Sequence, residues 1–313
     1  MERKTILAVD IGGTKYSVGL VSENGVIISK QKYTWWHISE ESIIAEICTA
    51  MQNILDENPR IVVTAVGITI TGLTDSVTGS WVSATYMGVY GLPIGKRIRE
   101  KFGFPVYVEN ECNASAVAEK MFGLCRKTEH FMYLSVGNGI GGALFLDGKL
   151  YRGAFGAAGE VGSCRMDEIV LKKRSTRKRD TLENLASARG ITDIYIKLGG
   201  KKKIDGEVPD ALTISKMAKE GDALACETFN IEGRYLGQVI ASSCMLLNPE
   251  KVIIGGGVAM SFNLFKQSLL ETVAQEAHIF AMGTPAKIQV TALGYDAGLL
   301  GAAAVALQAE GDT

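Results

Sequence analysis

The same order of apolar and polar segments occurs twice along the chain. Residues 5–33 read as an apolar strand, a glycine turn, a second strand, an Asn-Gly hairpin signal and a third strand. Residues 131–152 repeat that order, with Asp-Gly as the hairpin signal. We therefore expect a βββ unit at the start of each half of the chain.

Each predicted βββ unit is followed by further segments of strand and helix character. Apolar runs predict strands at RIVVTAVGITITG and FPVYVEN in the first half, and at EKVIIGGG and AKIQVTALG in the second. Helical periodicity is clearest over residues 41–56, 221–246 and 261–277. This alternation predicts an α/β fold in which a mixed sheet is flanked by helices in each of two lobes.

The repeated pattern also predicts where the lobes divide. We expect residues 1–116 to form a small N-terminal lobe and residues 117–296 to form a large C-terminal lobe. The last segment, residues 297–313, is rich in glycine and alanine, and such a helix can pack very close to a neighbour. We expect this helix to return to the first lobe.

Composition and charge narrow the functional classes. The chain has 313 residues, 47% of them hydrophobic, and a formal net charge of -1. A chain with so little net charge has no bulk attraction to nucleic acid or to an anionic membrane. No apolar run reaches membrane-spanning length, the first strand begins almost at once, and the six cysteines occur singly. We expect a cytoplasmic protein without a nucleic-acid or membrane partner.

Three glycine-rich turns each follow an apolar strand. They are Asp10-Ile11-Gly12-Gly13-Thr14-Lys15, Gly137-Asn138-Gly139-Ile140-Gly141-Gly142 and Gly255-Gly256-Gly257. Glycine lets backbone N–H groups approach phosphate oxygens, and a carboxylate such as Asp10 can hold a hydrated Mg²⁺. The alternative is three ordinary tight turns. Neither GxGxxG after the first strand nor GxxxxGK[ST] is present, which disfavours dinucleotide-binding and P-loop sites.

The segment VYVENECNASAVAE, residues 106–119, places two carboxylates and two amides at a predicted strand-to-helix corner. One interpretation is a helix N-cap at Asn110 with Glu111 in the first turn, where the helix dipole favours an acid. The other interpretation is a substrate site, because carboxylates and amides pair with adjacent hydroxyl groups. The residue pattern alone leaves both open.

Five motifs, DIGGTK, GNGIGG, GAAGEVG, LENLASARGI and VIIGGGV, resemble in their order the ROK family of sugar kinases and sugar-responsive repressors. The resemblance runs from about residue 5 to residue 307. It implies a two-lobed actin/hexokinase-like (ribonuclease H-like) ATPase fold with a duplicated βββαβαβα unit. It also implies ATP in a cleft between the lobes, a sugar substrate and a homodimer. Because the chain begins at the first ATPase strand, without the helix-turn-helix extension of the repressors, it resembles the kinase branch.

The resemblance further implies roles for individual residues. The implied ATP-binding set, used with Mg²⁺, is Asp10, Gly12, Gly13, Thr14, Lys15, Gly137, Asn138, Gly139, Gly256 and Gly257. The implied substrate-binding set is Asn110, Glu160, Glu183, Ser163 and Thr85. The family's usual Glu-Asn-Asp-Ala-Asn matches residues 109–113, which makes Glu111 the catalytic base, one methylene longer than the usual aspartate. A displacement of about an ångström can cost about a hundredfold in rate. Either the pocket has adapted to Glu111 or catalysis has faded.

Other departures from the family pattern bear on the substrate. Ser163 stands where a histidine is usual, Thr85 replaces an amide, Val89 replaces an indole, and Thr71 replaces a proline. The cysteine knuckle of many members is missing after Cys164, so the segment cannot supply four soft ligands and structural zinc is disfavoured.

Two hypotheses follow from these observations. The first is an ATP- and Mg²⁺-dependent sugar kinase whose altered pocket suits a substrate other than plain glucose. The second is a sugar- or nucleotide-binding regulatory protein without kinase activity, motivated by Glu111 and by the missing histidine and knuckle. The basic run at residues 172–180 is either a solvated loop or a contact for an anionic substrate.

Overall fold

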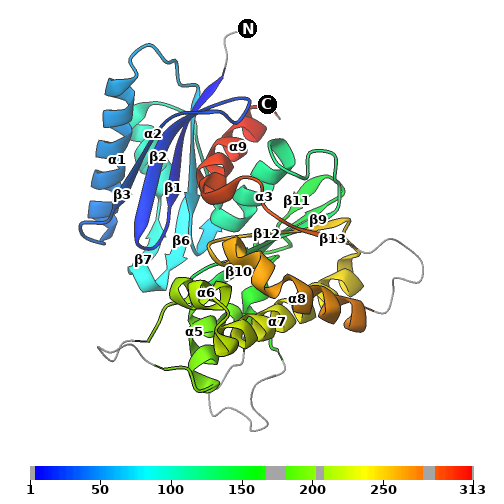
Figure 1. The fold of residues 1–313 in the computed structure, drawn as a ribbon. Helices are drawn as coiled ribbons and strands as arrows, with labels where there is room; N and C mark the ends of the chain where they lie inside the picture. Colours follow the sequence, from blue (N-terminus) through cyan, green and yellow to red (C-terminus); the bar gives the residue numbers. More distant parts are fainter. Residues whose placement is uncertain (1–3, 167–180, 202–207, 278–285, 312–313) are drawn as a thin grey trace. The chain divides into compact units, whose positions relative to one another are not determined.

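The computed structural model forms two units, with two sheets in unit 1 and one sheet in the described part of unit 2 (Figure 1). Each unit has its own hydrophobic core. Unit 1 comprises Met1–Lys127, Arg152–Ala157 and Ala292–Thr313, and unit 2 comprises Thr128–Tyr151 and Ala158–Thr291. The structure describes residues 4–166, 181–201, 208–277 and 286–311. The basic run at residues 172–180 lies outside these ranges.

Unit 1 carries two sheets and the helices that cover them. Its strands are β1 (Thr5–Ile11), β2 (Lys15–Ser22), β3 (Ile27–Thr34), β4 (Ala65–Ile70), β5 (Leu73–Asp75), β6 (Ser80–Ala84), β7 (Val89–Leu92) and β8 (Val106–Asn110). Its helical segments are α1 (Glu40–Glu57), η1 (Thr85–Met87), α2 (Ile94–Phe102), α3 (Glu111–Met121), η5 (Gly294–Asp296) and α9 (Ala297–Gly311). The strand orders are β3-β2-β1-β4-β8 and β5-β6-β7. The first predicted βββ unit, both strands predicted after it and the helix predicted over residues 41–56 are confirmed.

The two faces of the large sheet in unit 1 are covered by different helices. Val18 and Leu20 of β2 belong to the same hydrophobic core as Ile43 of α1. Gly19, between them, faces the other way, and a Cβ built there would lie 2.9 Å from a methyl group of Leu299 in α9. Side chains alternate between the faces of a strand, so this one strand contacts both covers. Figure 1 shows α1 and α9 on either side of the sheet.

Helix α9 approaches its neighbours in unit 1 at backbone distance. A Cβ built at Gly67 in β4 would lie 1.8 Å from the carbonyl oxygen of Ala302. A Cβ built at Gly301 would lie 2.8 Å from the carbonyl carbon of Ala114 in α3. Only glycine leaves room for such contacts. The close packing predicted from the glycine and alanine content of this helix is therefore confirmed.

Unit 2 repeats the strand pattern of unit 1. Its strands are β9 (Phe131–Val136), β10 (Ile140–Leu146), β11 (Lys149–Tyr151), β12 (Lys251–Gly255) and β13 (Lys287–Val290). Its helical segments are η2 (Val161–Ser163), α4 (Leu182–Ala186), α5 (Ala188–Lys197), α6 (Ala211–Lys219), α7 (Ala223–Leu247), η3 (Val258–Ser261) and α8 (Phe262–Glu276). The sheet order is β11-β10-β9-β12-β13, with β12 parallel to both β9 and β13. The second βββ unit, the two strands predicted after it, and the helices predicted over 221–246 and 261–277 are confirmed.

The substitution Gly67→Ala tests the contact between α9 and the sheet. We expect the free energy of unfolding to fall by about 1–3 kcal/mol, because the added methyl group would overlap a backbone carbonyl that has no rotamer to change. Urea denaturation of the purified protein measures this. The matched control is Gly311→Ala on the same helix, where a Cβ meets open space. If both variants unfold at the wild-type urea concentration, the contact is not as close as described.

Candidate functional site

The first glycine turn of unit 1 joins β1 to β2 and is held through its backbone. The Gly12 N–H donates to the Lys15 carbonyl oxygen at 2.9 Å, and the Trp35 indole N–H donates to the Gly12 carbonyl oxygen at 3.0 Å. Trp35 is itself packed on the Tyr16 ring, with 4.2 Å between ring centroids. Thr14 and Lys15 are exposed. The turn is thus fixed in shape, while the side chains assigned to phosphate point to solvent.

Asp10 is the penultimate residue of β1, beside this turn, and lies against α9. Its carboxylate accepts a hydrogen bond from the Thr69 hydroxyl at 2.9 Å, across the register pair that joins β1 to β4. A Cβ built at Gly298, in the first turn of α9, would lie 2.5 Å from the Asp10 Oδ1. Burial raises the pKa of the Asp10 carboxyl, and the nearby charge of Asp296 adds to the rise. The Thr69 hydrogen bond and the charge of Lys32 act in the opposite direction.

Asn110 ends β8 and caps α3. Its Oδ1 accepts hydrogen bonds from the backbone N–H groups of Cys112 at 2.8 Å and Asn113 at 3.3 Å. Its Nδ2 donates to the Gly72 carbonyl oxygen at 2.9 Å, which engages one of the two N–H groups of the amide. The helix-cap interpretation of this corner is therefore confirmed. The role of Asn110 as a sugar ligand stays a prediction.

Glu109, the first carboxylate of the corner, is structural. It is 2% exposed and accepts hydrogen bonds from the Asn113 side chain at 3.1 Å and the Asn110 backbone at 2.9 Å. Its second oxygen accepts two hydrogen bonds from Arg152, with the Nε at 3.0 Å. A buried carboxylate is stable only with such a partner. Arg152 therefore compensates Glu109 and fixes the start of α3.

Glu111, the second carboxylate, has no such compensation. It is the first residue of α3, it is partly buried, and no residue that the structure describes donates a hydrogen bond to it. Burial, and after it the negative charge of Asp10, raises the pKa of Glu111 to about 7. A carboxyl group with that pKa changes its charge near neutral pH, so it can take up and release a proton there.

The turn after β4 lies in the same unit and is held by two aromatic side chains. The Trp81 indole N–H donates to the Thr71 carbonyl oxygen at 2.8 Å. The Tyr86 hydroxyl donates to the Thr71 Oγ1 at 2.7 Å. Thr85, which immediately precedes Tyr86 in η1, is exposed. The departures from the family pattern at positions 71 and 85 therefore fall on one connected stretch of unit 1.

The second and third glycine turns lie side by side in unit 2, because they follow the adjacent parallel strands β9 and β12. The Gly137 N–H donates to the Gly139 carbonyl oxygen at 2.9 Å. A Cβ built at Gly137 would lie 3.9 Å from the Gly257 nitrogen. Gly256 has a φ of +85°, and a Cβ there would lie 2.3 Å from the Val136 carbonyl oxygen. Both the conformation and the space at Gly256 thus require glycine.

Glu183 of α4 lies against the second glycine turn. Its Oε2 accepts a hydrogen bond from the Ile140 N–H at 3.0 Å. A Cβ built at Gly139 would lie 2.7 Å from the same oxygen. Asn138, on this turn, is exposed. Glu183, assigned to the sugar by the resemblance, thus also supports the turn assigned to the nucleotide.

The part of the GAAGEVG segment that belongs to unit 2, residues 158–162, packs against β10. Gly159 has a φ of +92°, and a Cβ there would lie 2.5 Å from the Gly142 carbonyl oxygen. This contact sets Glu160 at the start of η2, with Ser163 exposed at its end. Burial, and after it the charge of Glu183, raises the pKa of Glu160. The two carboxylates assigned to the sugar are therefore close enough to act on each other.

The predicted site residues thus form one group in each unit. Unit 1 holds Asp10, Gly12, Gly13, Thr14, Lys15, Thr85, Asn110 and Glu111. Unit 2 holds Gly137, Asn138, Gly139, Glu160, Ser163, Glu183, Gly256 and Gly257. Trp35, Tyr86 and Arg152, whose hydrogen bonds support the group in unit 1, were not predicted from the sequence. For Tyr86 one local signal was available, because it lies within TYMGVY, a stretch that departs from the family pattern at Thr85 and Val89.

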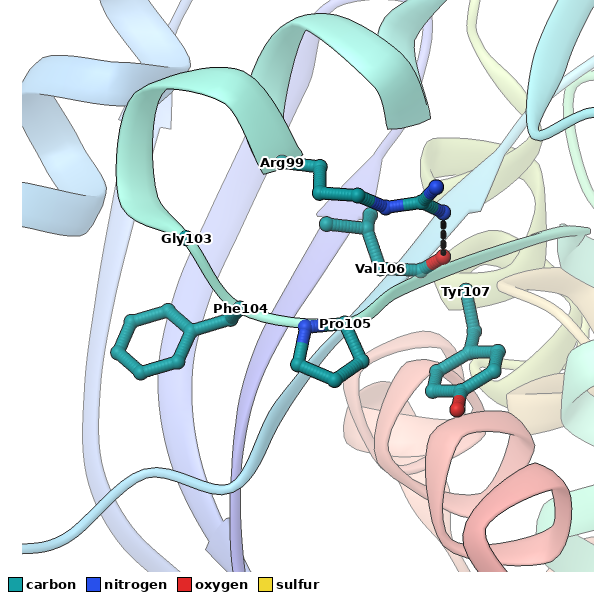
Figure 2. A pocket seen from close by; sticks show the side chains of 6 residues that line it. All are labelled: Arg99, Gly103, Phe104, Pro105, Val106 and Tyr107. Atoms are coloured by element: carbon teal, nitrogen blue, oxygen red, sulfur yellow. Dashed lines mark hydrogen bonds between the residues drawn. The ribbon is translucent and has the colours of Figure 1, made fainter. Parts of the chain in front are cut away.

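A separate pocket of about 370 Å³ opens at the other end of β8 (Figure 2). It is lined by Arg99, Gly103, Phe104, Pro105, Val106 and Tyr107. The Arg99 guanidinium donates to the Val106 carbonyl oxygen at 3.4 Å, as the dashed line in Figure 2 marks. Val106 begins β8 and Asn110 ends it, roughly 13 Å away at the rise of an extended strand. None of the lining residues is a predicted site residue.

The described ranges contain no group of three or more His, Cys, Asp or Glu side chains that could hold a metal ion. Nor does any helix in them have the length and apolar character needed to cross a membrane.

Comparison with known proteins relates the whole described fold to one family. The model of the ROK family matches residues 6–309. A glucokinase of Thermotoga maritima is 31% identical over 322 residues, covering 97% of this chain and 98% of the relative. A xylose repressor of Caldicellulosiruptor bescii is 30% identical over 317 residues, covering 97% of this chain and 78% of the repressor.

Solved structures agree with these relatives. The ROK family glucokinase of Streptomyces griseus, in complex with glucose and AMPPNP, superposes with a TM-score of 0.80 at 28% identity, covering 97% of this chain and 98% of that one. A ROK family transcriptional regulator, a homologue of the E. coli MLC protein, superposes with a TM-score of 0.86 at 25% identity, covering 97% of this chain and 78% of that one. The predicted actin/hexokinase-like α/β fold is confirmed, and this chain belongs to the ROK family.

Proposed function

We propose that this protein is an ATP-dependent sugar kinase in which Glu111 is the general base. The observation that carries the proposal is the state of that carboxyl group, which is partly buried, accepts no hydrogen bond within the described residues and has a pKa of about 7. A general base works best when its pKa lies near the working pH. The glucokinases among the relatives support the same reading.

The proposed reaction is transfer of the γ-phosphoryl group of ATP to a hydroxyl group of the sugar. Glu111 accepts the proton of that hydroxyl while the hydroxyl oxygen forms a bond to the γ-phosphorus. The bond from this phosphorus to the β,γ-bridging oxygen breaks, and ADP leaves. Such a reaction depends on positioning and on charge neutralisation more than on covalent help from the protein. The capping bonds of Asn110 and the ion pair of Glu109 with Arg152 supply that positioning for Glu111.

Asp10 is the group in unit 1 that we assign to the Mg²⁺ of the nucleotide. Carboxylate oxygens are the ligands that Mg²⁺ prefers, and one carboxylate acting through water suffices when phosphates supply the rest. The neighbouring carboxylate Glu111 adds negative charge beside Asp10 that a cation would offset, whereas Asp296 is already paired with Lys30 at 2.6 Å. When bound, Mg²⁺ supplies positive charge to the phosphate oxygens.

The remaining assignments follow the two groups of residues. We assign Gly12, Gly13, Thr14 and Lys15 to the phosphates, with Gly137, Asn138, Gly139, Gly256 and Gly257 also holding the nucleotide. We assign Asn110, Thr85, Glu160, Ser163 and Glu183 to the sugar. Asn110 can meet a substrate oxygen with its second amide N–H. Carboxylates such as Glu160 accept hydrogen bonds from paired hydroxyl groups, which distinguishes a sugar from its epimers.

A second candidate function is a regulatory protein that binds sugar or nucleotide without turnover. The observations that favour it are the glutamate at position 111, where the family's kinases usually have aspartate, and the similarity to a repressor and a regulator. We further propose a homodimer as the assembly and the cytoplasm as the location. The homodimer rests on the family resemblance, and the location rests on the single cysteines and the lack of a long apolar run.

The substitution Glu111→Gln tests the base. We expect ADP release with the preferred sugar to fall by at least about a hundredfold, because the amide cannot accept the proton. A coupled assay over a panel of sugars, amino sugars and sugar derivatives measures this, with nucleotide binding followed by calorimetry. Glu41→Gln is the control, since Glu41 also lies in the first turn of a helix and is exposed.

Glu111→Asp separates the two candidates: an adapted kinase loses rate, whereas a faded one gains it. A wild-type protein that binds ATP but turns over no sugar would contradict the proposal.

The pKa of Glu111 also predicts how the rate depends on pH. Only the ionised carboxylate accepts the proton, so kcat/KM for the sugar should rise as the pH increases and level off above about 7. Rate measurements from about pH 5.5 to about pH 9 check this. The profile of the Glu41→Gln control should match that of the wild type. A rate that stays constant across this range would mean that another group accepts the proton.

The same pKa predicts a difference in stability between wild type and Glu111→Gln. The folded state raises the pKa from 4.5 to about 7, so folding favours the protonated carboxyl group. The stability that this group contributes is complete at low pH and is lost as the pH rises through about 7. We therefore expect the free energy of unfolding of Glu111→Gln at about pH 8.5 to exceed that of the wild type by on the order of 1–3 kcal/mol. Urea denaturation measures this difference. Near pH 4.5 the two proteins should be alike. A variant less stable than wild type at high pH would contradict the raised pKa.

A further inference from the structure

Tyr86 is an exposed aromatic residue that contacts the candidate site but has no role in the function proposed so far. It lies in η1, directly after Thr85, and is 64% exposed. A side chain so open to solvent is normally free to change rotamer. Tyr86 instead makes a defined contact at its ring and another at its hydroxyl group. Both contacts fall within unit 1.

The ring contact is with the first glycine turn. A Cβ built at Gly13 would lie 2.6 Å from the Tyr86 Cε2 and 3.3 Å from its hydroxyl oxygen. The phenol ring therefore lies directly on the backbone of Gly13. The absence of a side chain at Gly13 makes room for this ring, and the ring in turn covers one side of the turn assigned to phosphate.

The hydroxyl contact fixes the orientation of the ring. The Tyr86 hydroxyl donates to the Thr71 Oγ1 at 2.7 Å, and Thr71 is itself anchored by Trp81, which is fully buried. A proline at position 71 would offer no hydroxyl group to this phenol. The threonine at position 71 and the tyrosine at position 86 therefore act as a pair.

The phenol group also lies within electrostatic reach of Glu111. Burial raises the pKa of Tyr86, the Thr71 hydrogen bond lowers it, and the negative charge of Glu111 raises it. Geometry ties the ring to the same corner. Thr71, which holds the Tyr86 hydroxyl, is followed by Gly72, and the Gly72 carbonyl oxygen accepts a hydrogen bond from the Asn110 side chain at 2.9 Å. Asn110 directly precedes Glu111, the carboxylate that we assign as the base. In the proposed reaction the attacking hydroxyl group must occupy the space beside that carboxylate.

We propose that Tyr86 determines substrate specificity by limiting the size of the carbohydrate that can lie beside Glu111. This inference rests on the proposed function and deepens it. The ring occupies volume that a smaller side chain would leave to the substrate, and the hydrogen bond to Thr71 holds the ring in that place. Carbohydrates with a bulky substituent near the reacting hydroxyl group are excluded by the ring.

The test compares two probes that differ in bulk, glucose and N-acetylmannosamine. Isothermal titration calorimetry gives the affinity for each probe, and the coupled assay gives kcat and KM. We expect Tyr86→Leu to raise the preference for N-acetylmannosamine over glucose by about tenfold, the effect of a cavity of a few methylene groups. Tyr86→Phe keeps the bulk of the ring but loses its hydrogen bond to Thr71, so it should raise the ratio less than Tyr86→Leu does, by up to about threefold. Thr71→Val, which removes the hydroxyl partner, should behave like Tyr86→Phe.

The matched control is Tyr90→Leu, which makes the same change at a tyrosine of similar exposure, 62%, in the same unit. We expect it to leave the ratio at the wild-type value. A ratio in Tyr86→Leu that stays within about twofold of wild type, or falls, overturns the inference. The affinity ratio can also change as expected although the protein turns over neither probe. That result would support the inference about Tyr86 and contradict the proposed kinase activity. A wild-type protein that binds neither probe overturns both.

Discussion

The group of site residues in unit 1 depends on one contact, the approach of α9 to the sheet at Gly67. There the backbone of Ala302 takes the place that any side chain would fill. Because α9 lies so close, its first turn reaches Asp10, and its glycine face meets α3, the helix that begins with Glu111. A packing constraint in the core of unit 1 thus sets the surroundings of both carboxylates.

That packing places two carboxylates, Glu109 and Glu111, in surroundings that are shielded from water and therefore disfavour charge. Glu109 is buried but has Arg152 as a partner, whereas Glu111 has no partner within the described residues and feels the charge of Asp10. The first arrangement stabilises the fold and the second opposes it. Functional sites commonly hold such uncompensated groups, with the energetic cost borne by the surrounding structure. In this protein the close contacts of α9, the cap at Asn110 and the Glu109–Arg152 ion pair can bear that cost.

Much of the fold could be predicted from the sequence because the signals are local. Strand, turn and hairpin follow one another within about thirty residues in both βββ units, and the long helices repeat an apolar period. The contacts that shape the candidate site are different. Trp35 and Gly12 are 23 residues apart, Tyr86 and Thr71 are 15 apart, and Arg152 and Glu109 are 43 apart. No period or motif joins such pairs, and only the folded chain brings them together. The cap at Asn110 is an intermediate case. Its partners, Cys112 and Asn113, are close in sequence, so a cap could be predicted, but the same residues also fitted a substrate site.

The chain order of unit 1 has a consequence for protein synthesis. Its sheet is encoded before unit 2, while the helix that covers one face of that sheet, α9, comes after it. At the usual rate of about 5–20 residues per second, the ribosome needs on the order of ten seconds or more to make the intervening segment. Throughout that interval the sheet lacks the contact that α9 makes at Gly67. The packing of unit 1 is therefore completed only after the whole of unit 2 has been synthesised.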